Sequence, residues 1–292
     1  MKTVIGDRTG SAAVDAAGAQ LVSLRDAEGR EYLWQGDPKY WSGQAPVLFP
    51  IVGSLRDNRA EVNGRSYEML RHGLARRMEF EKAGSSDDSV SYLLKSNDAT
   101  RERYPFGFEF TVSYRFRDGT LSVGFLVRNT GAETMPFAVG GHPAFNCPLE
   151  AGERFEDYDV VFSREETASC PGLDPKTGLI DFSDRTPVLR NQSVLPMSHG
   201  LFAHDALVFD GLRSDSVSLK SRKTGRGVRL DFAGFPFLGV WSAANDAPFV
   251  ALEPWTGCAT AKDEGDDLFQ KRGMTLLEPG KSRSVGFTVT LL

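Results

Sequence analysis

Apolar and polar residues alternate along residues 108–127, and this pattern constrains the fold more than any other feature of the chain. The two apolar runs are separated by Asp118-Gly119, a dipeptide that favours a tight hairpin turn. Because residues two apart lie on one face of a strand, the segment predicts two long antiparallel strands with one buried face. The alternating residues are Phe108, Phe110, Val112, Tyr114, Phe116, Leu121, Val123, Phe125 and Val127.

Shorter strand patterns recur at intervals of roughly ten residues, and little of the chain favours helix. Two early hairpins are expected, one joining residues 20–24 to 31–34 and one turning at Asn63-Gly64. Residues 98–104 predict a short helix that Pro105 ends, and residues 170–195 are too rich in turn residues to assign. The other expected strands are 90–94, 157–163, 206–209, 216–221, 227–232, 237–241, 249–253 and 284–292.

These strands predict an all-β fold, a large antiparallel β-sandwich, formed as a single domain over residues 1–292. With 40% hydrophobic residues, a chain of 292 residues can bury a large core. No change of composition marks a linker between domains. The pattern leaves open whether the protein is a monomer or a homodimer.

Charge and cysteine content exclude several classes of partner. The net charge is −5 and lysines and arginines form no block, so neither nucleic acid nor a membrane surface is an expected partner. No segment reaches membrane-spanning length, and the N-terminus lacks the apolar core of a secretion signal. The cysteines Cys147, Cys170 and Cys258 are widely spaced and odd in number, which favours a reducing compartment and a cytoplasmic protein.

Candidate catalytic chemistry centres on Gly140-Gly141-His142-Pro143. Two glycines allow a close approach of the backbone, and Pro143 biases His142 toward extended backbone. A histidine held stiffly at a strand end is suited to proton transfer. A turn histidine that only forms hydrogen bonds is the competing interpretation.

A second group of candidates comes from other strand ends. Glu253 follows an apolar run, and burying a carboxylate there is costly unless it has partners. Trp255 offers a flat apolar face on which a sugar can stack. Asp205 precedes the strand at 206–209, and His72 precedes a glycine. A salt bridge for Glu253 and a turn role for Asp205 are the simpler alternatives.

No cofactor or metal is expected. The histidines lack the spacing of a metal site, and there is no phosphate-binding glycine loop and no serine nucleophile motif. Arg56, Arg71 and Arg76 fall near the candidate residues, and their planar guanidinium groups suit sugar hydroxyls or a phosphate.

Four motifs in this order resemble the aldose 1-epimerase (galactose mutarotase) family over essentially the whole chain, with the bacterial LacX-type subgroup as the nearest. They are Arg71-His72-Gly73, Gly140-Gly141-His142-Pro143-Ala144-Phe145, His204-Asp205-Ala206-Leu207 and Leu252-Glu253-Pro254-Trp255-Thr256-Gly257.

The resemblance implies a galactose mutarotase-like β-sandwich that interconverts the α and β anomers of a hexose or related aldose. His142 would be the general acid and Glu253 the general base. His72 and Asp205 would hold sugar hydroxyls, and either Arg56 or Arg71 would bind substrate. Ring opening and reclosure need only one acid and one base.

Three alternatives remain open. A hexose 6-phosphate mutarotase would need arginines or lysines at one end of the site, from Arg56, Arg71, Arg76 and Lys39. A carbohydrate-binding or sensing protein would use Trp34, Tyr40, Trp41 and Trp255 to stack on sugars without turnover. A glycoside hydrolase would need a second carboxylate, and Asp205 is the candidate to face Glu253.

Overall fold

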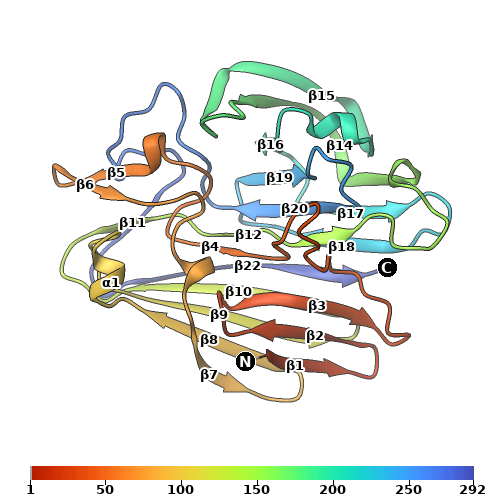
Figure 1. Cartoon of the computed structure of the whole chain (residues 1–292), viewed down its shortest axis with the longest axis horizontal. Coiled ribbons are helices and arrows are strands. Elements are labelled where there is room, and N and C mark those ends of the chain that lie inside the picture. The colour runs from red at the N-terminus through yellow and green to blue at the C-terminus, as the bar shows by residue number, and fades with distance from the viewer. Residues whose placement is uncertain (1) are drawn as a thin grey trace.

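The structure, a computed structural model, describes residues 2–292 and consists mainly of antiparallel sheets (Figure 1). The largest sheet has nine strands in the order β15-β14-β17-β18-β22-β10-β9-β8-β7. In chain order these are β7 (Glu81–Ser85), β8 (Ser89–Lys95), β9 (Phe108–Arg117), β10 (Thr120–Asn129), β14 (Tyr158–Leu173), β15 (Ile180–Pro196), β17 (Ser216–Ser221), β18 (Gly227–Asp231) and β22 (Ser282–Leu291).

A six-stranded sheet carries Glu253 and Trp255, and His142 lies between two of its strands. Its order is β16-β19-β20-β12-β4, and β13 also pairs with β20. The strands are β4 (Val47–Leu48), β12 (Gly140–Gly141), β13 (Ala144–Asn146), β16 (Leu207–Asp210), β19 (Phe237–Trp241) and β20 (Phe249–Trp255). Every residue of β20 is buried, and the strand pairs with β19 on one side. It is therefore a central strand of this sheet.

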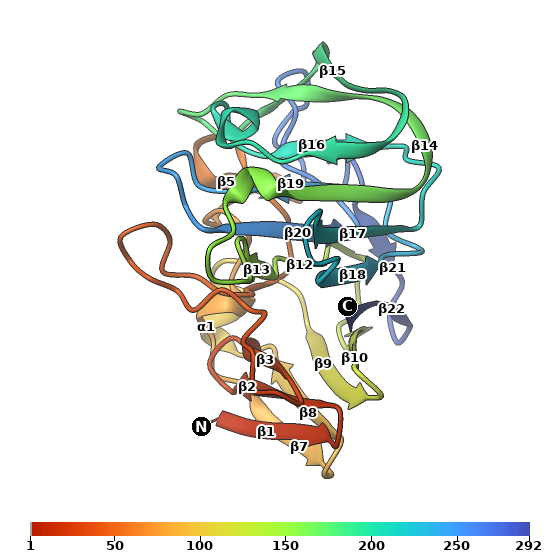
Figure 2. The same ribbon diagram turned by 90° about the vertical axis from the view of Figure 1, so that its right-hand side faces the viewer.

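The remaining elements are small. A three-stranded sheet of β1 (Lys2–Asp7), β2 (Gly10–Asp15) and β3 (Gln20–Asp26) contacts β8 and β9. In Figure 2 this sheet and the β14–β15 hairpin lie at opposite ends of the molecule. The others are the pair β5 (Arg59–Val62) and β6 (Arg65–Glu68), the pair β11 (Met135–Phe137) and β21 (Thr275–Leu277), the helix α1 (Asp98–Arg101), and the 3₁₀ turns η1 (Arg56–Asn58), η2 (Ala75–Arg77), η3 (Phe155–Asp157) and η4 (His199–Phe202).

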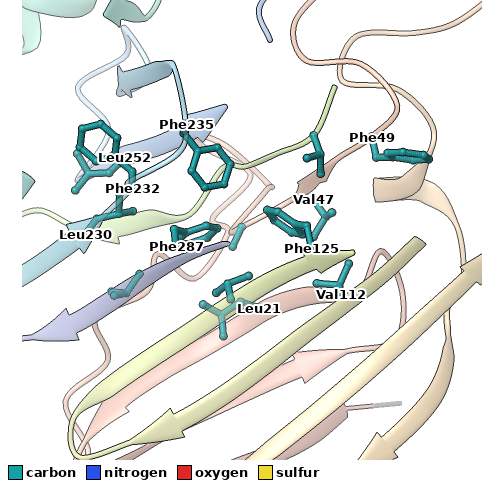
Figure 3. Packing of buried hydrophobic residues seen from close by; sticks show 14 of the residues in the cluster. Leu21, Val47, Phe49, Val112, Phe125, Leu230, Phe232, Phe235, Leu252 and Phe287 are labelled. Carbon is teal, nitrogen blue, oxygen red and sulfur yellow. The ribbon is translucent and has the colours of Figure 1, made fainter. Parts of the chain in front are cut away.

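One hydrophobic cluster joins the sheets. Phe125 of β10 and Phe287 of β22 belong to it, with ring centroids 6.0 Å apart (Figure 3). Leu21 from the three-stranded sheet and Leu252 from β20 belong to the same cluster. No helix within residues 2–292 has the length and apolarity needed to cross a membrane.

The predicted antiparallel β-sandwich is confirmed, and its clearest element is the hairpin of β9 and β10. Every predicted inward residue from Phe108 to Val127 is buried. The turn at Asn63-Gly64 also matches, since both residues have positive φ, 51° and 73°, as this hairpin turn requires.

Several local predictions were incomplete. Residues 20–24 and 31–34 are joined by an isolated bridge between Arg25 and Glu31 and by a hydrogen bond from the N–H of Tyr32 to the carbonyl of Leu24, and not by a continuous ladder. The strands β1 and β2 were missed because their buried face consists partly of small residues, which give a weak apolar pattern. The helix covers only residues 98–101. Residues 170–195, unassigned from the sequence, lie mostly in the β14–β15 hairpin, whose four register shifts break the alternation.

The Phe125→Ala variant should test the importance of this cluster. Phe125 is 2% exposed, so its truncation should lower the free energy of unfolding by about 3–5 kcal/mol through lost burial and a cavity. Leu126→Ala is the matched control, since Leu126 is the next residue of β10 and is 43% exposed. Urea unfolding measures both, and equal losses in the two variants would contradict the assigned packing.

Candidate active site

A cavity of about 480 Å³ lies beside the six-stranded sheet. Val208, Trp241 and Glu253 line it from β16, β19 and β20. The tip of the β14–β15 hairpin, residues 173–180, lines another side. A volume of this size suits a ligand as large as a sugar.

His142 is held at the cavity by the short strand β12. Gly140 pairs with Trp255 of β20 and with Leu48 of β4, and the backbone N–H of His142 donates to the carbonyl of Pro46 over 3.2 Å. The glycine is required for the close approach, because a Cβ atom on Gly140 would lie 2.6 Å from the indole of Trp255. These backbone contacts fix the position of the chain at His142.

An indole covers one face of this imidazole. Trp41 stacks on His142 with ring centroids 4.9 Å apart and planes at 23°. Trp241 meets the same imidazole edge-on, with centroids 5.5 Å apart. From the sequence, Trp41 was a candidate to stack on a sugar; its position against His142 could not be found there, because residues 36–44 form a loop without a periodic pattern.

Glu253 faces His142 from β20. Its Oε2 lies 3.1 Å from His142 Nε2, and the two residues are only 1% and 7% exposed. Within residues 2–292, Glu253 Oε2, His142 Nδ1 and Trp255 Nε1 have no aligned hydrogen-bond partner. Buried polar atoms are rarely left unpaired, so these atoms indicate a place for polar groups of a ligand.

Burial determines the protonation of this pair. It lowers the pKa of the His142 imidazole to about 3, and it raises the pKa of the Glu253 carboxyl well above its usual range. The charged forms are disfavoured because a buried site solvates them poorly. Between these two pKa values the pair holds one proton and carries no net charge.

The side chain of His72 lies next to that of His142. Its ring centroid lies 5.6 Å from that of His142, and its Nδ1 accepts a hydrogen bond from the backbone N–H of Gly53 over 3.2 Å. Burial lowers the pKa of His72 well below its usual value, and repulsion from a protonated His142 would act in the same direction. A neutral imidazole that accepts at Nδ1 carries its proton on Nε2, which leaves Nε2–H to donate to a ligand.

Asp205 and Arg71 form an ion pair at the cavity. Arg71 Nη2 donates to Asp205 Oδ2 over 3.1 Å, and Asp205 Oδ1 accepts from the N–H of Ala206 over 2.9 Å. Both Asp205 and His72 have positive φ, 80° and 67°. Such conformations are uncommon for residues other than glycine and are concentrated at functional sites.

Arg56 lies elsewhere. Its guanidinium donates to the carbonyls of Ala261, Lys262 and Glu264 and pairs with Asp266. The six other candidate residues all line the one cavity: Arg71, His72, His142, Asp205, Glu253 and Trp255. Of the two arginines that the resemblance left in competition, the geometry favours Arg71.

The sequence patterns also did not predict part of the cavity lining. Residues 173–180 reach the cavity because β14 and β15 extend far beyond the predicted strand at 157–163. Glu253 was expected to end its strand, whereas β20 continues to Trp255 through Pro254. Within residues 2–292, no three His, Cys, Asp or Glu side chains are grouped so as to hold a metal ion.

The fold is that of a galactose mutarotase-like β-sandwich protein. The chain belongs to the aldose 1-epimerase family, whose model matches residues 1–290. It is 44% identical over 281 residues to the chromosomal protein LacX of Lactococcus lactis, and this match covers 94% of each of the two chains.

Solved structures agree with this assignment. A galactose mutarotase related enzyme from Lactobacillus acidophilus is 36% identical, with a TM-score of 0.96, and the match covers 100% of this chain and 97% of that chain. A galactose mutarotase-like protein from Lactobacillus casei is 31% identical, with a TM-score of 0.92 and full coverage of both chains. The predicted family is thus confirmed.

The Glu253→Gln variant should be more stable than the native protein at alkaline pH. A raised pKa means that the folded state holds a proton that the unfolded state releases, so the carboxyl costs stability as the pH rises above the unfolded value of 4.5. Glutamine removes this cost. Urea unfolding should therefore show a gain at about pH 8 that disappears near about pH 4.

A matched control is Glu68→Gln, since Glu68 lies on the exposed face of β6. This variant should leave the free energy of unfolding nearly unchanged at both pH values. A gain in Glu253→Gln that did not depend on pH would show that the carboxyl is not held in its protonated form.

Proposed function

We propose that the protein is an aldose 1-epimerase, which interconverts the α and β anomers of an aldose by opening and reclosing its ring. The observation that carries this proposal is the buried pair of His142 and Glu253, with Nε2 and Oε2 3.1 Å apart at a cavity of sugar size. Membership of the aldose 1-epimerase family supports it.

The reaction needs two proton transfers at neighbouring oxygens. Glu253, as carboxylate, takes the proton from the C1 hydroxyl, the bond between C1 and the ring oxygen breaks, and His142 gives a proton to the ring oxygen. Rotation about the bond between C1 and C2 turns the aldehyde, and the reverse transfers close the ring on its other face. No proton is gained or lost, so the pair ends in its starting state.

The resting pair favours neutral groups, with its single proton on Glu253. A bound sugar fills the cavity with hydroxyl groups, and hydrogen bonds to a carboxylate favour its charged form. We infer that binding moves the proton from Glu253 to His142 across the short distance between them. His72 Nε2–H and the Asp205 carboxylate would hold hydroxyl groups and fix the ring against the pair.

A glycoside hydrolase receives less support. Its second carboxylate would be Asp205, which is already paired with Arg71 and hydrogen-bonded to the backbone of Ala206. A binding protein without turnover would not need an acid and a base, such as His142 and Glu253, buried in contact with each other.

Substitution of either member of the pair should abolish most of the activity. His142→Gln and Glu253→Gln should each reduce kcat for anomer exchange by about 10²–10⁴-fold, the usual contribution of general acid–base catalysis. Polarimetry of freshly dissolved α-glucose and α-galactose measures the rate above the spontaneous one.

The matched control is His199→Gln. His199 stacks on Phe155 and does not line the cavity, so this variant should retain native rates. Saturable sugar binding by the native protein without faster anomer exchange would refute the enzyme and favour the binding protein.

The pH profile provides an independent test. Because burial lowers the pKa of His142 to about 3, its imidazole should not titrate in the usual histidine range. The value of kcat/KM should therefore not fall as the pH is lowered from about 7 to about 5. A fall centred near about pH 6.5 in a still folded protein would show that His142 titrates as if exposed.

A further inference from the structure

Arg76 enters the cavity from a rigid segment. It lies in η2, four residues after His72, and the N–H groups of Leu74 and Ala75 both donate to the carbonyl of Phe49. Its guanidinium side chain lines the cavity together with that of Arg71. Both arginines therefore belong to the segment that also carries His72.

The side chain of Arg76 lacks a partner. No hydrogen bond, ion pair or ring contact joins it to any other side chain or carbonyl within residues 2–292. Arg71 pairs with Asp205, and Arg56 bonds to three carbonyls and Asp266. A guanidinium has five N–H donors, and half-burying it without acceptors is unfavourable.

The charges at the cavity do not balance. Asp205 neutralises Arg71, and Glu253 is held by burial in its neutral form in the resting pair. No lining carboxylate remains for Arg76, so the cavity holds an excess positive charge. Burial lowers the pKa of Arg76, and the charges of Arg77 and Arg71 act in the same direction, yet an arginine remains protonated in proteins. An anion would relieve both the repulsion and the missing hydrogen bonds.

The position of this charge relative to the reacting pair is suitable. Arg71 and Arg76 line the same cavity as His142 and Glu253. The cavity thus has an acid–base pair at one place and unsatisfied guanidinium donors at another, which would orient a sugar that carries one charged substituent.

We propose that Arg76, assisted by Arg71, binds an anionic group of the sugar, so that the preferred substrate is an aldose bearing a phosphate ester or a carboxylate. This inference rests on the proposed function for the reaction at C1, but the anion site itself does not depend on turnover. A planar fork of donors matches phosphate and carboxylate oxygens better than it matches scattered hydroxyls.

The test compares neutral and anionic sugars. Exchange between the α and β forms is measured by NMR at C1 for glucose and galactose, for their 6-phosphates, and for glucuronate and galacturonate. The native protein should show a higher kcat/KM for an anionic sugar than for its neutral parent. Comparing the 6-phosphates with the uronates shows whether the site prefers a phosphate ester or a carboxylate.

The decisive variant is Arg76→Gln, with Arg77→Gln as its matched control. Arg77 is the exposed neighbour on η2, so its change removes the same charge outside the cavity. In Arg76→Gln the ratio of kcat/KM for the anionic sugar to that for the neutral sugar should fall by about 10²-fold, as for loss of one member of a buried charge pair. Arg77→Gln should leave the ratio within about threefold, because an exposed charge is screened. Because both sugars are measured on the same sample, the ratio does not depend on how much of the variant is folded. Arg76→Lys should keep part of the preference for the anionic sugar.

Binding is measured separately, by calorimetry with inorganic phosphate and with each sugar. Phosphate that binds the native protein and not Arg76→Gln supports the anion site, even if no sugar is turned over and the epimerase proposal fails. Equal kcat/KM for neutral and anionic sugars, or an unchanged ratio in Arg76→Gln, overturns the anion site while leaving the epimerase proposal intact.

Discussion

The site depends on the register between β12, β20 and β19. Gly140 is paired with Trp255, and Gly239 of β19 is paired with Glu253. Successive side chains of a strand point to opposite faces, so a shift of one residue would move Glu253 away from His142 to the other side of the sheet. A Cβ on Gly140 or Gly239 would lie 2.6 Å or 2.7 Å from the indole of Trp255, and the two glycines thus let the strands close around that ring.

Around this register the protein maintains several unfavourable features. Among residues 2–292, His142 and Glu253 are buried with unpaired polar atoms, His72 and Asp205 have positive φ, and the Arg76 guanidinium lies at the cavity without a partner. Each feature costs stability by itself. They persist because the sheets on either side share one large hydrophobic cluster, whose burial outweighs such local costs. Unfavourable features gathered at one cavity are typical of a functional site.

The success of sequence-based prediction followed the strength of the local pattern. The hairpin of β9 and β10 was predictable because its inward residues are large and its turn dipeptide is distinctive. The strands β1 and β2 were not, because small residues such as Ala12 bury little apolar area. The long hairpin of β14 and β15 was hidden by register shifts, each of which moves the next side chain to the other face and breaks the period of two.

For the site, the sequence by itself determined which residues could carry acid–base chemistry, since His142, Glu253, His72 and Asp205 each stand beside a glycine, a proline or a strand end. Only the tertiary structure decided how they meet. It brought His142 and Glu253 to 3.1 Å, placed Trp41 on the imidazole, turned Arg56 away and left Arg76 unpaired at the cavity. The reason is that local sequence determines strand propensity and turn type, whereas contacts between distant residues follow from sheet register and packing.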